Sequence, residues 1–292
     1  MYTRVYSYNL NYTHSCRYNL WRNNLNIEKN KIYNIDCSIG LKEMDDCTVD
    51  LTLTSPPYDG IRAYNGYSFD FENIAKELFR VTRDGGTVVW IVNDQTIKDN
   101  ETGSAFMQAL YFKEIGFNLH DTMIYHKNAV GACGSVNAYN QAFEYMFVLA
   151  KGKMKTFNPL KDIKALNRGR MRNYATNRSG VHGYNLNTVA KITPLNSKNQ
   201  NVWSYDIGFQ SSDKSWHPAT FPEKLARDHI VSWSNVGDLI LDPFMGSGTT
   251  AKIAIMYNRN YIGFEISEEY VKKSEKRLDN IKSGFYYILD AL

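Results

Sequence analysis

The sequence predicts an α/β fold of the Rossmann-like type, in which helices cover both faces of a largely parallel sheet. Apolar runs of strand length alternate with segments of helical periodicity, as in doubly wound α/β proteins. A turn, Gly246-Ser247-Gly248, stands between an apolar run and an apolar helical stretch, which is the arrangement of nucleotide-binding sites. A proline pair, Pro56-Pro57, directly follows another apolar run and cannot continue a sheet ladder.

The individual elements follow from the same periodicities, since short apolar runs favour buried strands and apolar residues three and four apart favour helices. The expected strands are Ile32–Asp36, Val49–Leu53, Thr87–Val92, Asn118–Tyr125, Phe143–Ala150, Leu239–Leu241 and Tyr261–Glu265. The expected helices are Phe69–Val81, Gly103–Gly116, Glu223–Trp233, Ala251–Met256 and Ser267–Lys282. Asp84-Gly85-Gly86 is expected to form a turn.

The segment Thr54-Ser55-Pro56-Pro57-Tyr58 is the first candidate site. Its prolines fix the backbone just past the end of a strand, where open α/β sheets bind ligands. They hold a hydroxyl, Ser55, and an aromatic ring, Tyr58, on either side. A small acceptor beside a flat ring suits an amine-bearing substrate such as a base taken out of the DNA stack. The alternative is a proline-stiffened loop with a packed tyrosine.

The second candidate site runs from Asp242 to Thr250 and reads Asp-Pro-Phe-Met-Gly-Ser-Gly-Thr-Thr. Its glycines allow a tight turn and a close backbone approach, and the lysine of a triphosphate-binding loop is missing. The next expected strand ends in Glu265, about 20 residues after the turn, which is the spacing of a carboxylate that takes two ribose hydroxyls. The alternative for Glu265 is a charge at the helix entry near Ser267.

Together these segments resemble the S-adenosylmethionine-dependent amino-methyltransferases of DNA. Thr54–Tyr58 is similar to the catalytic motif of that family, and Asp242–Thr249 is similar to its cofactor motif. The catalytic motif comes first in the chain, as in the family's beta group, whose methyltransferase sheet is circularly permuted. The Ser-Pro-Pro-Tyr form is typical of the cytosine-N4 enzymes, whereas a minority of adenine-N6 enzymes have variants of the motif.

The resemblance implies a role for each matching residue. The implied catalytic residues, which position the exocyclic amine of a flipped base, are Ser55, Pro56, Pro57 and Tyr58. The implied cofactor is S-adenosyl-L-methionine, and no metal is expected. Its implied binding residues are Asp36, Cys37, His217, Pro218, Ala219, Phe221, Asp242, Pro243, Phe244, Gly246, Ser247, Gly248, Thr249, Thr250, Glu265 and Ile266. For Asp36 the alternative is a cap on the turn at Ser38, and for 217–222 it is an ordinary helix entry.

The resemblance also divides the chain into regions. Residues 1–31 are an N-terminal arm, residues 32–151 and 213–292 are the methyltransferase catalytic domain, and residues 152–212 are the inserted target-recognition region that reads the DNA sequence. The permutation implies that the strand ending at Glu265 lies beside the strand ending at Asp36. A cofactor acid can therefore stand at position 36, far in sequence from the glycine turn.

The distribution of charge favours DNA contact by this insertion. Residues 151–200 contain eleven Lys and Arg and one acid, a net charge of +10, whereas the whole chain carries +4 and its remainder therefore −6. Such asymmetry suggests a phosphate-binding surface, and the alternative is a solvated charge run. The residues singled out for DNA binding are Lys153, Lys155, Arg168, Arg170, Arg172 and Arg178.

Composition limits the remaining possibilities. A chain of 292 residues can form one core plus an insertion. No apolar run reaches the length of about 18 residues that predicts a membrane span, and the N-terminus lacks the apolar centre of a signal peptide. The four cysteines are sparse and include no Cys-x-x-Cys pair, which argues against a disulfide framework or a zinc site and fits a reducing cytoplasm. We expect a cytoplasmic, nucleoid-associated protein of a bacterium or phage that acts on double-stranded DNA.

Three other functions fit parts of the sequence. They are the same chemistry on adenine N6, a sequence-specific DNA-binding protein with an inactive methyltransferase module, and a nicotinamide-dependent oxidoreductase. Against the last, Ala251 stands where a Gly-x-Gly-x-x-Gly pattern needs its third glycine. The sequence leaves open the target site, a homodimer, and a cognate restriction endonuclease.

Overall fold

The centre of the molecule is an eight-stranded sheet with the strand order β1-β16-β15-β2-β3-β7-β6-β14. The computed structural model describes residues 26–57, 69–128, 139–160, 200–206, 216–217, 220 and 222–289, together with two-residue strands between 163 and 197. Within the sheet, β7 (Phe143–Lys151) is antiparallel to its neighbours β3 (Thr82–Val92) and β6 (Phe117–Lys127), and the other pairs are parallel. The predicted α/β class with a parallel-rich sheet is confirmed.

The other strands have these bounds in chain order. The sheet contains β1 (Lys31–Asn34), β2 (Val49–Thr54), β14 (Val202–Tyr205), β15 (Leu239–Asp242) and β16 (Asn260–Glu265). A small hairpin consists of β4 (Thr96–Ile97) and β5 (Asn100–Glu101). Three further strand pairs lie in the region of the expected insertion: β8 (Ile163–Lys164), β9 (Met171–Arg172), β10 (Ala175–Thr176), β11 (His182–Gly183), β12 (Lys191–Ile192) and β13 (Asn196–Ser197).

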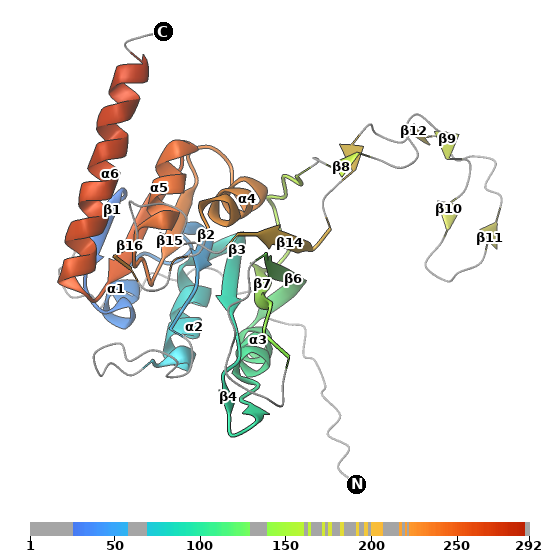
Figure 1. Ribbon diagram of the computed structural model, residues 1–292. Helices are drawn as coiled ribbons and strands as arrows, with labels where there is room; N and C mark the ends of the chain where they lie inside the picture. The colour runs from blue at the N-terminus through green and yellow to red at the C-terminus, as the bar shows by residue number, and fades with distance from the viewer. Residues whose placement is uncertain are drawn as a thin grey trace.

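Helices cover both faces of the sheet (Figure 1). On one face lie α1 (Cys37–Glu43), α2 (Phe71–Val81) and α3 (Ser104–Glu114); on the other lie α4 (Glu223–Trp233), α5 (Thr249–Met256) and α6 (Glu268–Leu289). Each face has its own hydrophobic core, because successive side chains of a strand point to opposite faces. In β3, Val88 and Trp90 pack toward α2 and α3, whereas Val89 and Ile91 pack toward α4 and α5.

The two ends of the folded region meet in the sheet, as the permutation implies. β1 pairs with β16 in parallel, and Asn34 stands opposite Glu265. The strand before α1 and the strand before α6 are therefore neighbours, although 231 residues separate Asn34 from the Glu265 carbonyl that its amide contacts. The prediction that the segment ending at Asp36 lies beside the segment ending at Glu265 is confirmed.

Some elements differ from the sequence prediction. The expected turn at Asp84-Gly85-Gly86 lies inside β3, where the ladder passes from Val49↔Thr82 to Leu51↔Thr87. Gly85 adopts a φ of +82° there, a conformation that glycine reaches without steric cost, so the extra residues bulge out and the strand continues. The β4–β5 hairpin and β14 were not predicted, because each is short and has no continuous apolar run.

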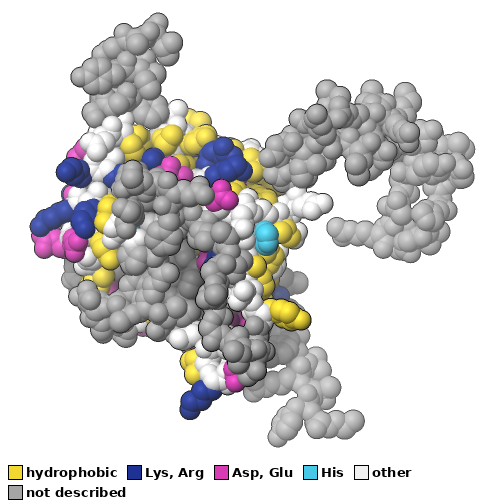
Figure 2. Space-filling view, viewed as in Figure 1, with side chains coloured by type: hydrophobic (Ala, Val, Ile, Leu, Met, Phe, Trp, Pro, Cys, Tyr) yellow, Lys and Arg dark blue, Asp and Glu magenta, His cyan; other side chains and the backbone are white. Residues whose placement is uncertain are grey.

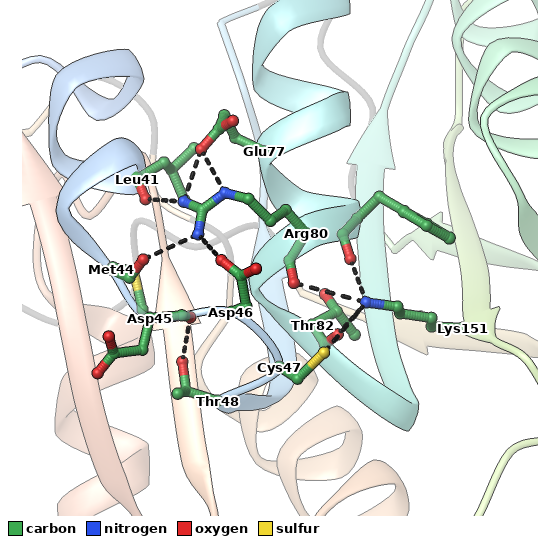
Figure 3. A network of polar contacts seen from close by, with 11 residues as sticks. Leu41, Met44, Asp45, Asp46, Cys47, Thr48, Glu77, Arg80, Thr82 and Lys151 are labelled. Atoms are coloured by element: carbon green, nitrogen blue, oxygen red, sulfur yellow. Dashed lines mark hydrogen bonds and ion pairs between the residues drawn. The ribbon is translucent and has the colours of Figure 1, made fainter. Parts of the chain in front are cut away.

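A polar network fixes the edge of the sheet at which β2 and β3 begin (Figure 3). Arg80, near the end of α2, donates to the carbonyls of Leu41 and Met44 at 2.6 and 2.9 Å and pairs with Glu77 at 2.7 Å. Lys151, at the end of β7, donates to the carbonyls of Phe79 and Thr82, each at 2.8 Å. Burial lowers the pKa of the Lys151 ammonium. These contacts tie α1, α2 and β7 together at this edge.

Basic and acidic side chains lie together over α6 on the face seen in Figure 2. Glu268 pairs with Lys272, and Glu269 with Lys273, at the i, i+4 spacing of exposed helical ion pairs. The surface over the first turns of α6 is therefore mixed in charge. No helix among the described residues is long and apolar enough to cross a membrane.

Candidate active site

The two motifs predicted from the sequence meet at one place on the sheet. β15 and β2 are adjacent and parallel, with Leu241 opposite Thr52. From β15 the chain winds outward through β16, whereas from β2 it winds the other way to β3. Ligands of open α/β sheets bind at such a reversal, outside the carboxyl ends of the strands. Ser55, Pro56 and Pro57 follow β2 there, and the glycine turn follows β15; we call this place the crevice.

Asp242, the last residue of β15, links the two motifs. Its Oδ1 accepts hydrogen bonds from the Thr54 hydroxyl at 2.7 Å and from the Phe244 N–H at 3.0 Å, and its Oδ2 accepts from the Thr250 hydroxyl at 2.7 Å. The side chain is buried, and this burial raises the pKa of Asp242 to about 6, although the hydrogen bonds from Thr250 and Thr54 oppose the shift. The end of β2 is thereby held to the start of α5.

The glycine turn needs glycine at two positions. Gly246 and Gly248 have φ values of +50° and +75°, which other L residues rarely adopt. A Cβ on Gly246 would lie 2.8 Å from Nε2 of His217. Gly248 then caps the N-terminus of α5 without a side-chain hydrogen bond, so the helix begins with main-chain N–H groups at the crevice, as at anion- and nucleotide-binding sites.

Glu265 ends β16 beside the turn. Its Oε2 accepts from the Gly246 N–H and its Oε1 from the Ser267 N–H, each at 2.9 Å. Burial raises the pKa of the Glu265 carboxyl. A carboxylate has about four lone-pair sites, so both oxygens retain capacity for ligand hydroxyls. Ile266 follows directly, and its carbonyl accepts from the amide of Asn34 at 2.9 Å.

Asp36 and Cys37 stand on the neighbouring strand end. Oδ1 of Asp36 accepts from the Ser38 N–H at 2.7 Å and caps α1, so the capping role considered from the sequence is present. The pairing of β1 with β16 brings this acid to the same edge as Glu265. Cys37 is buried, and burial raises the pKa of its thiol to about 12, which keeps it protonated.

His217 connects the segment before α4 with the turn. Its ring is buried, lies 4.6 Å from the ring of Tyr270 on α6, and touches the space over Gly246. Phe244 packs on the other face of the sheet against Phe69, with ring centroids 5.7 Å apart. Of the predicted catalytic and cofactor-binding residues, four lie outside the described part of the chain: Tyr58, Pro218, Ala219 and Phe221.

The predicted DNA-binding residues are not all at the crevice. Lys153 and Lys155 are exposed and follow β7, which ends where the parallel strands begin, so they lie at the opposite edge of the sheet. Arg172 belongs to β9, whereas Arg168, Arg170 and Arg178 lie outside the described residues.

Several residues hold the site through contacts that the sequence did not predict. Thr54 contacts Asp242 across 188 residues. On α6, Ser274 and Arg277 hydrogen-bond to the glycine turn, and Arg277 pairs with Glu223 on α4. A helix face with Tyr270, Ser274 and Arg277 at spacings of four and three residues was the available signal, since such residues share one side of a helix.

The fold and the site define an α/β enzyme with an adenosine-type cofactor. The features are a doubly wound sheet, a glycine turn, an acid on the next strand and a proline-fixed motif at the reversal point. Residues 49–276 match the family profile described as DNA methylase, so the chain belongs to this N6/N4 DNA methyltransferase family. The protein is a site-specific DNA methyltransferase, and its family depends on S-adenosylmethionine.

Known proteins support the assignment. The orphan methyltransferase M.BamHII of Bacillus amyloliquefaciens is 51% identical over 251 residues, which cover 82% of this chain and 92% of that one. The DNA adenine methyltransferase YhdJ of Escherichia coli K12 is 27% identical, with 86% and 83% covered. Among solved structures, the cytosine-N4-specific PvuII DNA methyltransferase shares the fold, with a TM-score of 0.63, 18% identity, and 84% of each chain covered.

Proposed function

We propose that this enzyme methylates the N4 amine of cytosine in double-stranded DNA by direct transfer to a flipped base. The observation that supports it best is the hydrogen bond from Thr54 to Asp242. It holds the end of β2, directly before Ser55, to Asp242, which leads into the turn that we assign to the cofactor. A methyl donor in the turn and an amine at Ser55 would then be neighbours.

The residues of the crevice fit S-adenosylmethionine. Glu265 would take the ribose hydroxyls, because its carboxylate already lies against the turn and has acceptor capacity left. Asp36 would accept from the adenine amine through the oxygen that does not cap α1. Gly246 to Thr250 would line the adenosine and methionine parts, with Asp242, Pro243 and Phe244 behind them, and residues 217–221 would lie beside the methionine end.

The chain's own groups would position the acceptor amine. When bound, the cofactor supplies an electrophilic methyl group on a sulfonium. The exocyclic amine of cytosine is a poor nucleophile, because its lone pair is delocalised into the ring. Ser55 Oγ and the carbonyl of Pro56 would accept its two N–H groups and direct the lone pair toward the methyl group. Tyr58 would stack on the flipped base, a contact of about 1–3 kcal/mol, and the amine proton would leave to water.

The choice of cytosine rests on the Ser-Pro-Pro-Tyr form of the motif. The proteins similar to this chain include enzymes named for each base. One is an adenine methyltransferase that is similar in sequence, and the other is a cytosine-N4-specific enzyme that is similar in fold. Adenine N6 is therefore the second candidate, with the same residues in the same roles, since both bases present an exocyclic amine.

The basic segment 151–200 would bind DNA phosphates and read the target sequence as the target-recognition region. The relative that is 51% identical is called an orphan methyltransferase, which favours action without a cognate restriction endonuclease. A homodimer and such an endonuclease stay open, whereas a cytoplasmic, nucleoid-associated location stays a prediction from the resemblance and the composition.

The test is nucleoside mass spectrometry of unmethylated DNA of broad sequence coverage, after incubation with the protein and S-adenosylmethionine. N4-methylcytosine is the expected product. N6-methyladenine would retain the site but overturn the base assignment. Absence of any methylated base, with cofactor binding intact, would favour the DNA-binding protein with an inactive module.

A further inference from the structure

Helix α6 holds the glycine turn from behind through two side chains. Ser274 Oγ donates to the carbonyl of Gly246 at 2.7 Å, and Arg277 Nη1 donates to the carbonyl of Ser247 at 2.7 Å and lies 3.3 Å from the hydroxyl of Thr249. Two consecutive carbonyls of the turn are therefore fixed by one helix face. Because the C=O and N–H of a trans peptide point in opposite directions, the N–H of Ser247 is directed away from α6.

Arg277 also connects the turn with α4. Its Nη2 donates to Glu223 Oε1 at 2.6 Å, and the same oxygen accepts from Lys252 of α5 at 3.0 Å. The Arg277 side chain is only 5% exposed. A buried guanidinium is costly unless its charge and its N–H groups are satisfied; here a carboxylate, a main-chain carbonyl and a hydroxyl satisfy it. Glu223 begins α4, directly after the segment that carries His217.

The turn needs such support more than an ordinary loop does. Both Gly246 and Gly248 are in the left-handed region, and glycine has the largest conformational freedom to lose on ordering. If the carbonyls of the turn were free, it would sample other shapes before a ligand binds. The affinity of a site falls in proportion to the fraction of molecules in the competent shape.

We propose that Arg277 is a positioning residue of the cofactor site, which preorders the glycine turn and couples it through Glu223 to the segment preceding α4. This inference rests on the proposed assignment of the turn to S-adenosylmethionine. Arg277 acts through the carbonyl of Ser247 and not by contact with the cofactor. Its loss therefore weakens cofactor binding and leaves the catalytic motif at Ser55 intact.

The test compares Arg277→Met and Arg277→Lys with the wild type by calorimetric titration with S-adenosylmethionine, steady-state methyl transfer and thermal unfolding. Arg277→Met loses the hydrogen bond to the Ser247 carbonyl, so fewer molecules have the turn in its binding shape. Cofactor binding is expected to weaken roughly tenfold to a hundredfold. Arg277→Lys keeps the positive charge, but a lysine ammonium lacks the planar guanidinium that reaches both Ser247 and Glu223. Its cofactor affinity should lie between those of the wild type and Arg277→Met. At saturating cofactor, kcat should return to within about threefold of wild type.

Arg80→Met is the matched control. Arg80 also donates to two main-chain carbonyls and pairs with carboxylates, but at the opposite edge of the sheet. It should lower the unfolding temperature as Arg277→Met does, with unchanged cofactor affinity. If Arg277→Met is too unstable to purify, Arg277→Lys tests the support of the turn, and Glu223→Gln tests the coupling to α4, because it removes the charge that Arg277 and Lys252 share. Wild-type affinity in the Arg277 variants, or in Glu223→Gln, would overturn the proposal.

A variant of the turn separates this inference from the proposed function. Gly246→Ala places a Cβ at 2.8 Å from His217 Nε2 and should abolish cofactor binding in a folded protein. If Gly246→Ala binds the cofactor normally, the assignment of the turn is wrong. If it does not bind while Arg277→Met binds as the wild type does, only the role of Arg277 is wrong.

Discussion

Replacing Asp242 with asparagine should remove a specific pH dependence of stability. The pKa of this buried carboxyl is raised from 3.8 to about 6 in the folded protein. A folded-state pKa above the unfolded one means that the neutral form favours the fold. The stabilising contribution is therefore fully present below about pH 4 and is lost as the pH rises through about 6.

The magnitude follows from the size of the shift. Each pKa unit corresponds to about 1.36 kcal/mol, so the full contribution of Asp242 is about 3 kcal/mol, of which roughly 2 kcal/mol falls between pH 4 and pH 7. Asparagine has the same shape and no titration. Its oxygen can accept from Thr54 and Phe244, and its NH₂ can donate to Thr250, whose hydroxyl can turn to the Leu53 carbonyl at 3.5 Å.

The assay is urea unfolding of both proteins at intervals from pH 4 to pH 7, analysed as the difference in free energy of unfolding. Other titrating groups are common to both proteins and cancel in the difference. The free energy of unfolding of Asp242→Asn, relative to that of the wild type, should increase by roughly 2 kcal/mol from pH 4 to pH 7. A difference that stays constant over this range would refute the reasoning, because it would mean that Asp242 does not titrate there.

Three further predictions concern the motif, the sheet edge and the insertion. Ser55→Ala should lower kcat on the order of tenfold to a hundredfold, because an acceptor of the amine is lost, with calorimetric cofactor affinity unchanged; wild-type turnover would remove Ser55 from the mechanism. Lys151→Met leaves the Phe79 and Thr82 carbonyls without their donor and should reduce the free energy of unfolding by about 1–3 kcal/mol, measured in urea, at constant cofactor affinity; an unaltered urea midpoint would count against the network. If residues 151–200 bind phosphates, the logarithm of the Kd for DNA should rise linearly with the logarithm of the salt concentration. A Kd that does not change with salt, measured by fluorescence anisotropy, would exclude that role.

The sequence predicted those parts of the fold that have a local signal. The glycine turn, the proline pair and the apolar runs of β2, β3 and β15 each depend on neighbouring residues, and the structure has them where they were expected. The bulge at Gly85 appeared as a turn signal, because a glycine pair marks both features equally. β14 has alternating polar and apolar residues at the sheet edge, so it lacked the continuous run that identified the buried strands.

The supports of the candidate site could not be predicted, because they are tertiary contacts without a local pattern. Thr54 is the first residue of the recognised motif, but its partner Asp242 lies 188 residues away, so its holding role had no local signal. Arg277 resembles any basic residue of a helix until α6 is docked against the turn, where it contacts Ser247 and Glu223. The candidate catalytic and cofactor-binding residues could thus be proposed from the sequence, whereas the contacts that hold their segments in place could be identified only from the fold.

The central claim is that the two motifs form one crevice for the cofactor and the target amine, and a crystal structure of the protein with S-adenosylmethionine tests it most directly. The ribose hydroxyls should lie within hydrogen-bonding distance of Glu265, the cofactor against Gly246–Gly248, and the methyl group should be directed toward Ser55. A cofactor bound away from Glu265, or with its methyl group turned away from Ser55–Pro57, would contradict this claim.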